Sequence, residues 1–225
     1  LGVSNAVRDD MRGNLPKFKE EHIQTLYNRI DVDAVQAEQV SREAAREFLS
    51  LPQDAWIVGN VGRLHPDKDQ TTLIKGFAKA LPELPEGSLL AIMGSGRLEQ
   101  QLKQLAVDLN VADSVCFLGQ IPNGRRYFKA FDLFALTSDH EPFGMVLLEA
   151  MAAGVPVIAT DCGGAKEIVS DPECLFGLGD VGGLSDLLIA SIGNSLSVSD
   201  TERFTDTQGC LRFWRWLSHE CNVLD

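Results

Sequence analysis

Residues 141–154 read EPFGMVLLEAMAAG, and this pattern predicts a short helix over 144–153 that is apolar on every side except at Glu149. A helix with apolar residues all round its surface is buried in the protein. An ionised carboxylate inside a protein costs on the order of several kcal/mol unless a partner compensates its charge. Glu149 must therefore meet a partner, which is either a cation of the protein or a ligand.

The start of this helix has the features of an anion site. Gly144 allows a tight turn into the helix, and the amides of Met145 and Val146 would be first-turn donors without intrahelical acceptors. Such amides bind anions well. Glu141 lies just outside the helix, so the site would combine open amides with two carboxylates, which suits a ligand with phosphate and hydroxyl groups. The structural alternative is that Glu149 pairs with a Lys or Arg and that Glu141 only caps the helix.

Short apolar runs and amphipathic segments alternate along the chain from residue 56. The runs cover residues 57–61, 89–93, 115–118, 133–136 and 155–159, with a short further run at 174–178. Runs of this kind predict strands that are buried on both faces of a parallel sheet. Apolar residues at helical spacing predict helices over 41–51, 73–81, 98–109, 123–131 and 184–192. Strands that alternate with helices predict right-handed βαβ units and a doubly wound α/β sheet.

The helix over 41–51 is the first of these predicted helices. Its apolar face consists of Ala44, Ala45, Phe48 and Leu49. The pair Leu51-Pro52 ends it, because the residue before a proline disfavours the helical conformation.

Ligands bind at the carboxyl ends of the strands in such sheets, so the loops there are informative. The loop after the first strand, GRLHPDK at 62–68, carries the cations Arg63 and Lys68 where a phosphate is expected. The alternative is a solvated loop with ordinary surface charges. The GSG loop at 94–96 follows the second strand but lacks the full GxGxxG dinucleotide fingerprint.

Two glutamates eight residues apart, with Phe143-Gly144 between them and AMAAGVPV after them, closely resemble the paired-glutamate signature of the retaining glycosyltransferase family 4. The loop at 62–68 is similar to the G-R-L…K element of that family. GQI at 119–121 is similar to its base-contacting loop. The whole resemblance extends from about residue 27 to residue 188.

Two further segments resemble the same family less completely. DCGG at 161–164 matches its G-G turn, with Glu167 at the usual acidic position but Ala165-Lys166 in place of the common apolar-Pro pair. The role of this turn stays open. YNRID at 27–31 resembles the crossover between the two domains of the family, with Arg29 where glycine is usual.

The resemblance implies a Rossmann-like sheet that forms the C-terminal, donor-binding half of a two-domain GT-B fold. The implied donor-binding residues are Arg63, Lys68, Phe143, Gly144, Met145, Val146 and Glu149. Of these, Arg63 and Lys68 would bind the diphosphate of a nucleotide sugar, and Glu149 would bind its ribose hydroxyls. Glu141 is the implied catalytic residue, in contact with the donor sugar. The nucleotide diphosphate sugar is a substrate, so the family resemblance implies neither a cofactor nor a bound metal.

The implied reaction transfers a sugar to an acceptor hydroxyl with retention of the anomeric configuration. The resemblance also implies three parts of the chain. Residues 1–32 are the end of a preceding acceptor domain and the crossover, and residues 33–194 are the nucleotide-sugar-binding domain. Residues 195–225 form a C-terminal helical tail. We therefore expect the chain to be a fragment that binds a donor but is inactive alone. Two alternatives are a nucleotide-sugar-binding module without activity and a GT-B-like epimerase or phosphorylase.

Charge and composition limit the partners. The net charge is -12 and the pI is near 4.7, which argues against nucleic acid or an anionic membrane as the main partner. We expect a nucleotide-sugar donor and a saccharide or glycolipid acceptor, with no nucleic acid. The segment LRFWRWL at 211–217 is aromatic and basic, so it is either an interfacial membrane helix or a C-terminal helix packed across the domain boundary.

Cysteine and acidic patterns complete the sequence analysis. The five cysteines contain no C-x-x-C pair, which is typical of reduced thiols in a cytoplasmic protein, and the four histidines lack the spacing of a zinc site. DVD at 31–33 matches the metal motif of the GT-A fold but precedes the first strand, so we do not expect a metal site there. Residues 143–160 are hydrophobic enough to suggest a membrane span, but Glu149 and the Gly154-Val155-Pro156 break argue against one.

Overall fold

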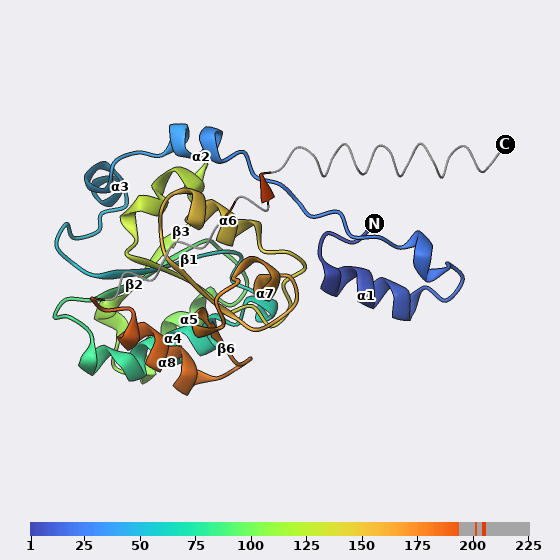
Figure 1. The fold of residues 1–225 in the computed structure, drawn as a ribbon. Coiled ribbons are helices and arrows are strands. Elements are labelled where there is room, and N and C mark those ends of the chain that lie inside the picture. Colours follow the sequence, from blue (N-terminus) through green and yellow to red (C-terminus); the bar gives the residue numbers. More distant parts are fainter. Residues whose placement is uncertain (194–200, 202–203, 206–225) are drawn as a thin grey trace.

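The computed structural model of the chain describes residues 1–193, 201 and 204–205 (Figure 1). Its centre is a six-stranded sheet in which every neighbouring pair of strands is parallel, in the order β3-β2-β1-β4-β5-β6. The strands are β1 (Ile57–Val61), β2 (Leu89–Met93), β3 (Val115–Gly119), β4 (Leu133–Leu136), β5 (Val157–Thr160) and β6 (Leu175–Phe176). The predicted doubly wound α/β sheet is therefore confirmed.

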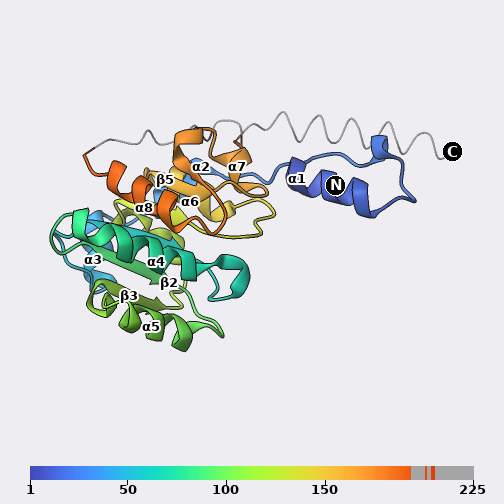
Figure 2. The ribbon, with the colours of Figure 1, turned by 90° about the horizontal axis from the view of Figure 1, so that it is seen from below.

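Helices cover both faces of this sheet. The α-helices are α1 (Asn5–Asn14), α2 (Val32–Glu38), α3 (Arg42–Phe48), α4 (Gln70–Ala80), α5 (Glu99–Asp108), α6 (Met145–Ala152), α7 (Ala165–Ile168) and α8 (Val181–Ala190). The 3₁₀ helices are η1 (Glu20–His22), η2 (Pro66–Lys68), η3 (Leu81–Glu83), η4 (Ala112–Ser114), η5 (Gly124–Ala130) and η6 (Pro172–Cys174). Helices α4, α5 and α8 lie on one face, and α2, α3 and α6 lie on the other (Figures 1 and 2).

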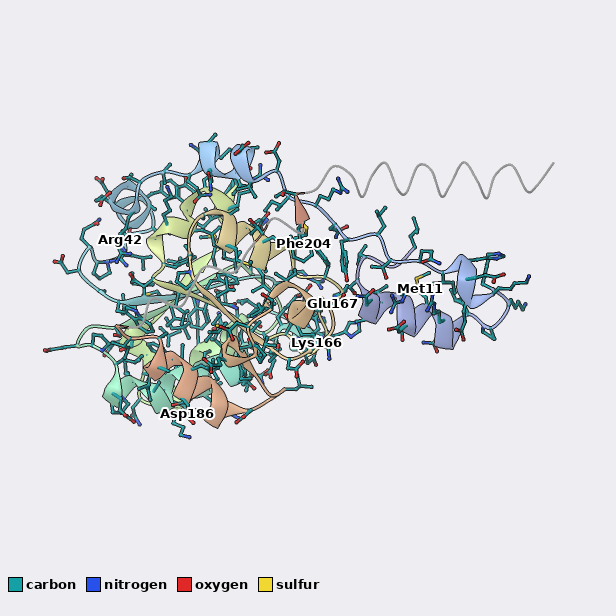
Figure 3. The ribbon with its side chains drawn as sticks, viewed as in Figure 1. Met11, Arg42, Lys166, Glu167, Asp186 and Phe204 are labelled. Carbon is teal, nitrogen blue, oxygen red and sulfur yellow. The ribbon has the colours of Figure 1, made fainter. Side chains whose placement is uncertain are left out.

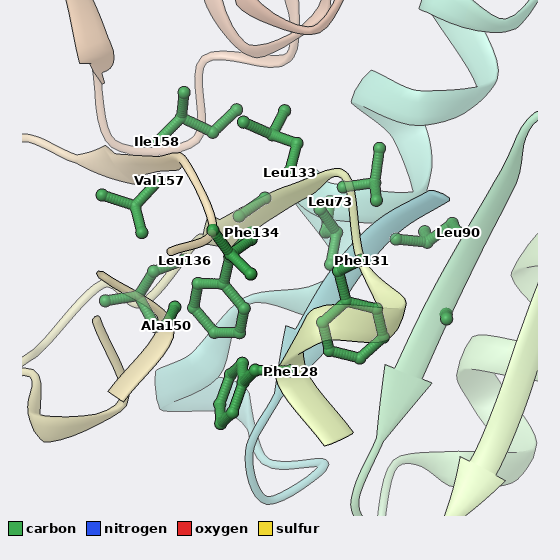
Figure 4. Close-up of a cluster of buried hydrophobic side chains, with 14 of the residues drawn as sticks. Leu73, Leu90, Phe128, Phe131, Leu133, Phe134, Leu136, Ala150, Val157 and Ile158 are labelled. Atoms are coloured by element: carbon green, nitrogen blue, oxygen red, sulfur yellow. The ribbon is translucent and has the colours of Figure 1, made fainter. Parts of the chain in front are cut away.

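The strand order changes direction at the neighbouring strands β1 and β4, which form the switch point of the sheet. Strands β2 and β3 follow β1 towards one edge, whereas β5 and β6 follow β4 towards the other. In open α/β sheets, ligands bind at the carboxyl ends of the strands on either side of such a switch point. The aromatic ring of Phe128 packs against those of Phe131 and Phe134 in the core, with centroids 6.0 and 5.5 Å away (Figure 4).

Helix α3 differs from the prediction in the face that it buries. Phe48 is 58% exposed and stacks on the ring of Tyr127, and Ala44 is also exposed. Arg46, which the apolar pattern excludes from the core, is fully buried together with Ala45 and Leu49. The reason is that Arg46 has partners inside the protein, and a buried charge with partners is tolerated.

Arg46 joins the starts of β1 and β4. Its guanidinium donates to Asp132 Oδ2 at 2.8 Å, and the same oxygen accepts a hydrogen bond of 2.7 Å from the amide of Ile57. Its other donors bind backbone carbonyls at 2.6 to 3.2 Å, namely those of Pro52, Gln53, Ala55 and Ala130. One buried cation thus fixes the segments that lead into both central strands.

The other predicted elements match with small shifts. The segment predicted as a helix over 123–131 is the 3₁₀ helix η5, and the strand predicted over 155–159 begins only at Val157. The apolar segment 143–160 forms α6 and β5, and no helix of the described chain is long and apolar enough to cross a membrane. Of the predicted tail over 195–225, only residues 201, 204 and 205 belong to the described part, so the helix predicted over 211–217 lies outside it.

The first 31 residues form an extension beside the sheet rather than part of it. Helix α1 lies next to α7 in both orthogonal views (Figures 1 and 2). A single parallel bridge joins Gly2 to Thr25 within this segment. The chain then runs through α2 and α3 along the sheet face before it enters β1.

We expect Arg46→Met to lower the free energy of unfolding by about 3–5 kcal/mol, because it breaks a buried ion pair and removes the donors of several buried carbonyls. Arg42→Met is the matched control: Arg42 also pairs with Asp132, at 2.7 Å, but its side chain is 42% exposed. An exposed pair contributes about 1 kcal/mol or less. Chemical denaturation measures both losses, and equally small losses would contradict a special role for Arg46.

Candidate functional site

The loops after β1 and β4 meet at the switch point. Lys68 Nζ donates to Glu141 Oε2 at 2.8 Å, and Thr137 Oγ1 donates to the backbone carbonyl of Lys68 at 2.9 Å. A backbone hydrogen bond of 3.1 Å from Asp139 to the carbonyl of Asp67 adds to the contact. The two predicted site segments, one around Lys68 and one around Glu141, are therefore in direct contact, although 73 residues separate these two side chains.

A pocket of about 480 Å³ lies above the carboxyl ends of β1, β2 and β3. Its lining residues are Val61, Gly62, Arg63, Met93, Gly94, Ser95, Gln120, Ile121, Gly124, Arg125, Phe128 and Glu149. All three loops that the sequence analysis examined at this edge contribute to it, and so does η5. Its ionisable lining consists of Arg63, Arg125 and Glu149.

Glu149 lines this pocket. Its side chain is half-buried, which is less burial than the apolar helix pattern predicts, because the pocket opens on this side of α6. Burial raises the pKa of Glu149, and the charge of Arg125 opposes that shift. Within the part of the chain that the structure describes, its carboxylate makes no hydrogen bond or ion pair. Arg125 pairs instead with Glu38, through two hydrogen bonds of 2.8 Å.

Glu141 is the more deeply buried of the two glutamates, at 8% exposure. Besides Lys68, it accepts a hydrogen bond of 3.3 Å from the hydroxyl of Ser138. It does not cap α6, because the N-cap residue of that helix is Gly144 and no side chain bonds to the cap. Of the structural alternative for the two glutamates, the capping role of Glu141 is therefore wrong, and the ion pair of Glu149 is not found among the described residues.

The start of α6 keeps its amides open. Gly144 has a φ of 106°, a left-handed conformation that glycine adopts without strain. The amides of Met145 and Val146 have no acceptor among the described residues, because the first internal bond of this turn is donated by Leu147 to Gly144. Phe143 contributes its ring elsewhere: it packs against Tyr27 and Phe204, with centroids 6.1 and 5.7 Å apart, and does not line the pocket.

The two cations predicted to bind the diphosphate, Arg63 and Lys68, differ in exposure and in ion pairing. Arg63 lines the pocket, its side chain is 71% exposed, and its contact is with Asp67 at 3.3 Å. Asp67 also contacts Nδ1 of His65. Lys68 is 20% exposed and engaged by Glu141. Arg63 can therefore turn towards a ligand at little cost, whereas Lys68 must first leave Glu141.

The Gly163-Gly164 turn, whose role the sequence left open, holds the loop that carries Glu141. The amide of Gly164 donates to the carbonyl of Glu141 at 2.7 Å. A Cβ at position 163 would lie 2.2 Å from that same oxygen, and one at position 164 would lie 2.5 Å from the Cα of Phe143. Only glycine fits between these backbones, so the pair of glycines was the sequence signal for this contact.

Sequence reasoning missed Arg125 and Ser138 as residues of the site. Nothing in a single sequence distinguishes them from ordinary polar residues, since both are brought to the site by contacts with distant segments. The DVD motif at 31–33 has a structural role, because Asp31 accepts a hydrogen bond of 2.9 Å from the amide of Ala34 at the start of α2. The described residues contain no group of three or more His, Cys, Asp or Glu side chains that could hold a metal ion.

Comparison with known proteins gives a family match. The family described as glycosyl transferases group 1 matches residues 41–192. The chain is similar to the lipopolysaccharide core biosynthesis glycosyltransferase LpsE of Rhizobium meliloti (strain 1021), with 34% identity over 165 residues, 72% of this chain and 47% of that protein. It is also similar to a GDP-mannose-dependent monoacylated alpha-(1-6)-phosphatidylinositol monomannoside mannosyltransferase of Corynebacterium glutamicum, with 39% identity over 158 residues, 66% of this chain and 41% of that protein. The chain thus spans less than half the length of these relatives.

Solved structures resemble the fold over most of the chain. The structure of Anabaena HepE in complex with UDP-glucose is similar to this chain with a TM-score of 0.82 and 26% identity. The match covers 97% of this chain and 63% of the HepE chain. The structure of WaaG, a glycosyltransferase involved in lipopolysaccharide biosynthesis, is similar with a TM-score of 0.73 and 25% identity. The match covers 86% of this chain and 53% of the WaaG chain.

We expect Glu149→Gln to raise the melting temperature of the ligand-free chain at neutral pH. Because burial raises the pKa of Glu149 in the folded state, its favourable contribution is complete below the unfolded pKa and is lost as the pH rises through the folded value. The amide keeps the shape without the charge, so the gain should vanish below about pH 4, under the ordinary glutamate pKa of about 4.3. Melting curves across pH measure this, with the exposed Glu86→Gln as control. A lower melting temperature at neutral pH would show that the carboxylate has a stabilising partner.

Proposed function

Because the chain belongs to the glycosyl transferases group 1 family, we propose that it is the donor-binding part of a retaining glycosyltransferase of family 4. The proposed reaction moves a sugar from a nucleotide diphosphate donor to an acceptor hydroxyl and keeps the anomeric configuration. The observation that carries this proposal is that one pocket at the switch point is lined by both Arg63 and Glu149, the latter without a partner among the described residues. The α/β sheet is of the Rossmann-like kind found in its GT-B structural neighbours.

The nucleoside end of the donor occupies the pocket in this proposal. The ribose hydroxyls donate to the carboxylate of Glu149, because a charged acceptor makes the stronger hydrogen bond and ribose supplies the donors that this group lacks. The base then lies towards Gln120 and Ile121, in the loop that the family resemblance associates with base contact. A ligand that satisfies Glu149 repays the cost of leaving that carboxylate unpaired in the free chain.

The diphosphate is held by Arg63, Lys68 and the open amides of Met145 and Val146. For Lys68 to reach a phosphate it must release Glu141, to which it is bound at 2.8 Å. The exchange has a useful consequence, since it frees the carboxylate of Glu141 to contact the donor sugar as the catalytic residue. Fixed donors around the departing diphosphate would stabilise the charge that develops there, which is an electrostatic form of catalysis. The charge of the substrate is offset by protein groups, and the proposal includes no metal and no cofactor.

The proposed partners are a nucleotide-sugar donor and a saccharide or glycolipid acceptor. Similarity to enzymes named for lipopolysaccharide core and phosphatidylinositol mannoside synthesis supports that class of acceptor. We propose that residues 1–32 are the end of an acceptor domain with the crossover. Residues 33–194 are then the donor domain, and residues 195–225 are the helical tail. A peripheral membrane contact is proposed for this tail. The proposed location is the cytoplasm, because the cysteines lack a pairing pattern.

Arg63→Ala or Lys68→Ala should weaken binding of a nucleoside diphosphate by at least about tenfold, since a hydrogen bond to a charged group contributes about 1.5–3 kcal/mol. Binding of the nucleoside alone should hardly change. Calorimetry measures both ligands, and Lys75→Ala on the exposed side of α4 is the matched control. Equal losses for the nucleoside and the nucleoside diphosphate would remove the diphosphate assignment.

Substitutions of the two glutamates should change the affinities for different ligands. Glu149→Gln should weaken binding of nucleoside diphosphate and nucleotide sugar alike, because both contain the ribose. Glu141→Gln should leave nucleoside diphosphate binding unchanged or tighter, since it loosens the hold on Lys68, and should weaken binding only of the intact nucleotide sugar. Affinities per folded molecule, with melting temperatures recorded for each variant, decide this. Weaker nucleoside diphosphate binding by Glu141→Gln would be incompatible with a contact to the sugar alone.

A further inference from the structure

The N-terminus of α1 is capped by Glu167, a residue of α7 that is distant in the sequence. The first amides of a helix have no acceptors inside it. The amide of Val7 donates to the hydroxyl of Ser4 at 3.1 Å, as in an ordinary N-cap. The amides of Asn5 and Ala6 donate to the two carboxylate oxygens of Glu167, at 3.0 and 2.9 Å. A negative charge is also favoured at a helix N-terminus.

Glu167 binds a second group of the N-terminal segment. The hydroxyl of Tyr27 donates to Glu167 Oε2 at 2.8 Å, and the side-chain amide of Asn5 donates to the hydroxyl of Tyr27 at 2.5 Å. One carboxylate therefore fastens both α1 and the segment that leads into the crossover. Figure 3 shows Glu167 on the side of the sheet domain that faces α1.

The same segment touches the loop that carries Glu141. Ser4 is fully buried, and its hydroxyl donates to the carbonyl of Pro142 at 2.6 Å. The ring of Tyr27 packs against Phe143. On the other side of this loop, the amide of Gly164 holds the carbonyl of Glu141 at 2.7 Å. Successive carbonyls of the loop are thus bound by two different segments.

Glu167 lies three residues after Gly164, so one short segment of the chain makes both sets of contacts. Gly164 binds the 141–143 loop directly. Glu167 binds the start of α1 and Tyr27, and this N-terminal segment contacts the same loop through Ser4 and Tyr27. None of the residues in this network lines the pocket that contains Arg63 and Glu149. The network therefore adjoins the loop of Glu141, where the proposed function puts the donor sugar, and not the pocket.

We propose that Glu167 is a positioning residue that sets the place of Glu141 by anchoring residues 1–31 against the 141–143 loop. The part of this inference that concerns ligands rests on the proposed function, since it assumes that Glu141 contacts the donor sugar. The anchor needs a carboxylate, because two backbone amides and a hydroxyl all donate to it. Glutamine has one acceptor oxygen and would turn an NH₂ group towards donors.

The test compares Glu167→Gln with Glu173→Gln, which changes an exposed glutamate six residues further along the chain. Hydrogen–deuterium exchange of peptides that cover Asn5 and Ala6 reads the anchor without any ligand. Affinities for UDP and UDP-glucose, and for GDP and GDP-mannose, read the site. Tyr27→Phe, which removes one hydroxyl and keeps the ring, is a milder variant for use if Glu167→Gln does not fold.

We expect faster exchange at the start of α1 in Glu167→Gln and not in the control. We also expect binding of the nucleotide sugar to weaken by roughly three- to tenfold, an effect of the size seen for residues that act without touching a ligand, with the nucleoside diphosphate unchanged. A merely structural role would weaken both ligands equally per folded molecule, and that result would overturn the proposal. Unchanged exchange at Asn5 and Ala6 would overturn it as well.

The two proposals fail separately in this experiment. If the unaltered chain binds none of the four nucleotides, the proposed function is wrong, whereas the exchange comparison still decides whether Glu167 anchors α1. If the unaltered chain binds a nucleotide sugar and Glu167→Gln binds it with the same affinity, the proposed function stands and the positioning role is wrong.

Discussion

The parallel pairing of β1 with β4 is the contact on which the rest of the structure depends. The register joins these strands over only two residue pairs, so further bonds must hold them. Arg46 and Asp132 fix the starts of the two strands at 2.8 Å, and the side chain of Asn60 donates to the carbonyl of Ala135 at 2.8 Å farther along. With the two strands held side by side, the loops that follow their carboxyl ends meet, as the contacts of Lys68 with Glu141 and Thr137 show.

Electrostatics differ between the two ends of this strand pair. At the starts of the strands, the guanidinium of Arg46 donates to a carboxylate and to backbone carbonyls, which are the partners that a buried charge requires. At the carboxyl ends, the compensation is incomplete: Glu149 has no partner among the described residues, and Arg63 is mostly exposed. A half-buried carboxylate without a partner, such as that of Glu149, costs stability in the free protein, and sites that bind ligands commonly accept that cost.

The sequence predicted the elements well where the pattern was local. Continuous apolar runs marked the central strands because each of those strands is buried on both faces, so nearly every side chain must be apolar. The buried face of α3 was predicted wrongly for the opposite reason. An arginine reads as a surface residue unless its partner is known, and the partner of Arg46 lies 86 residues away. Segment 123–131 shows the same limit on a smaller scale, since its apolar spacing fits both an α-helix and the 3₁₀ helix that forms.

The residue types at the site were also readable from the sequence, whereas their states were not. The spacing of Glu141 and Glu149 and the cations of the 62–68 loop indicated a site for a ligand with phosphate and hydroxyl groups. Only the tertiary structure decided that Glu141 is the buried glutamate, bound to Lys68, and that Glu149 is the open one. The physical reason is that burial and pairing depend on which distant segments pack against each side chain. A sequence determines which groups are available to a site, and the packing of the folded chain determines which of them are already engaged.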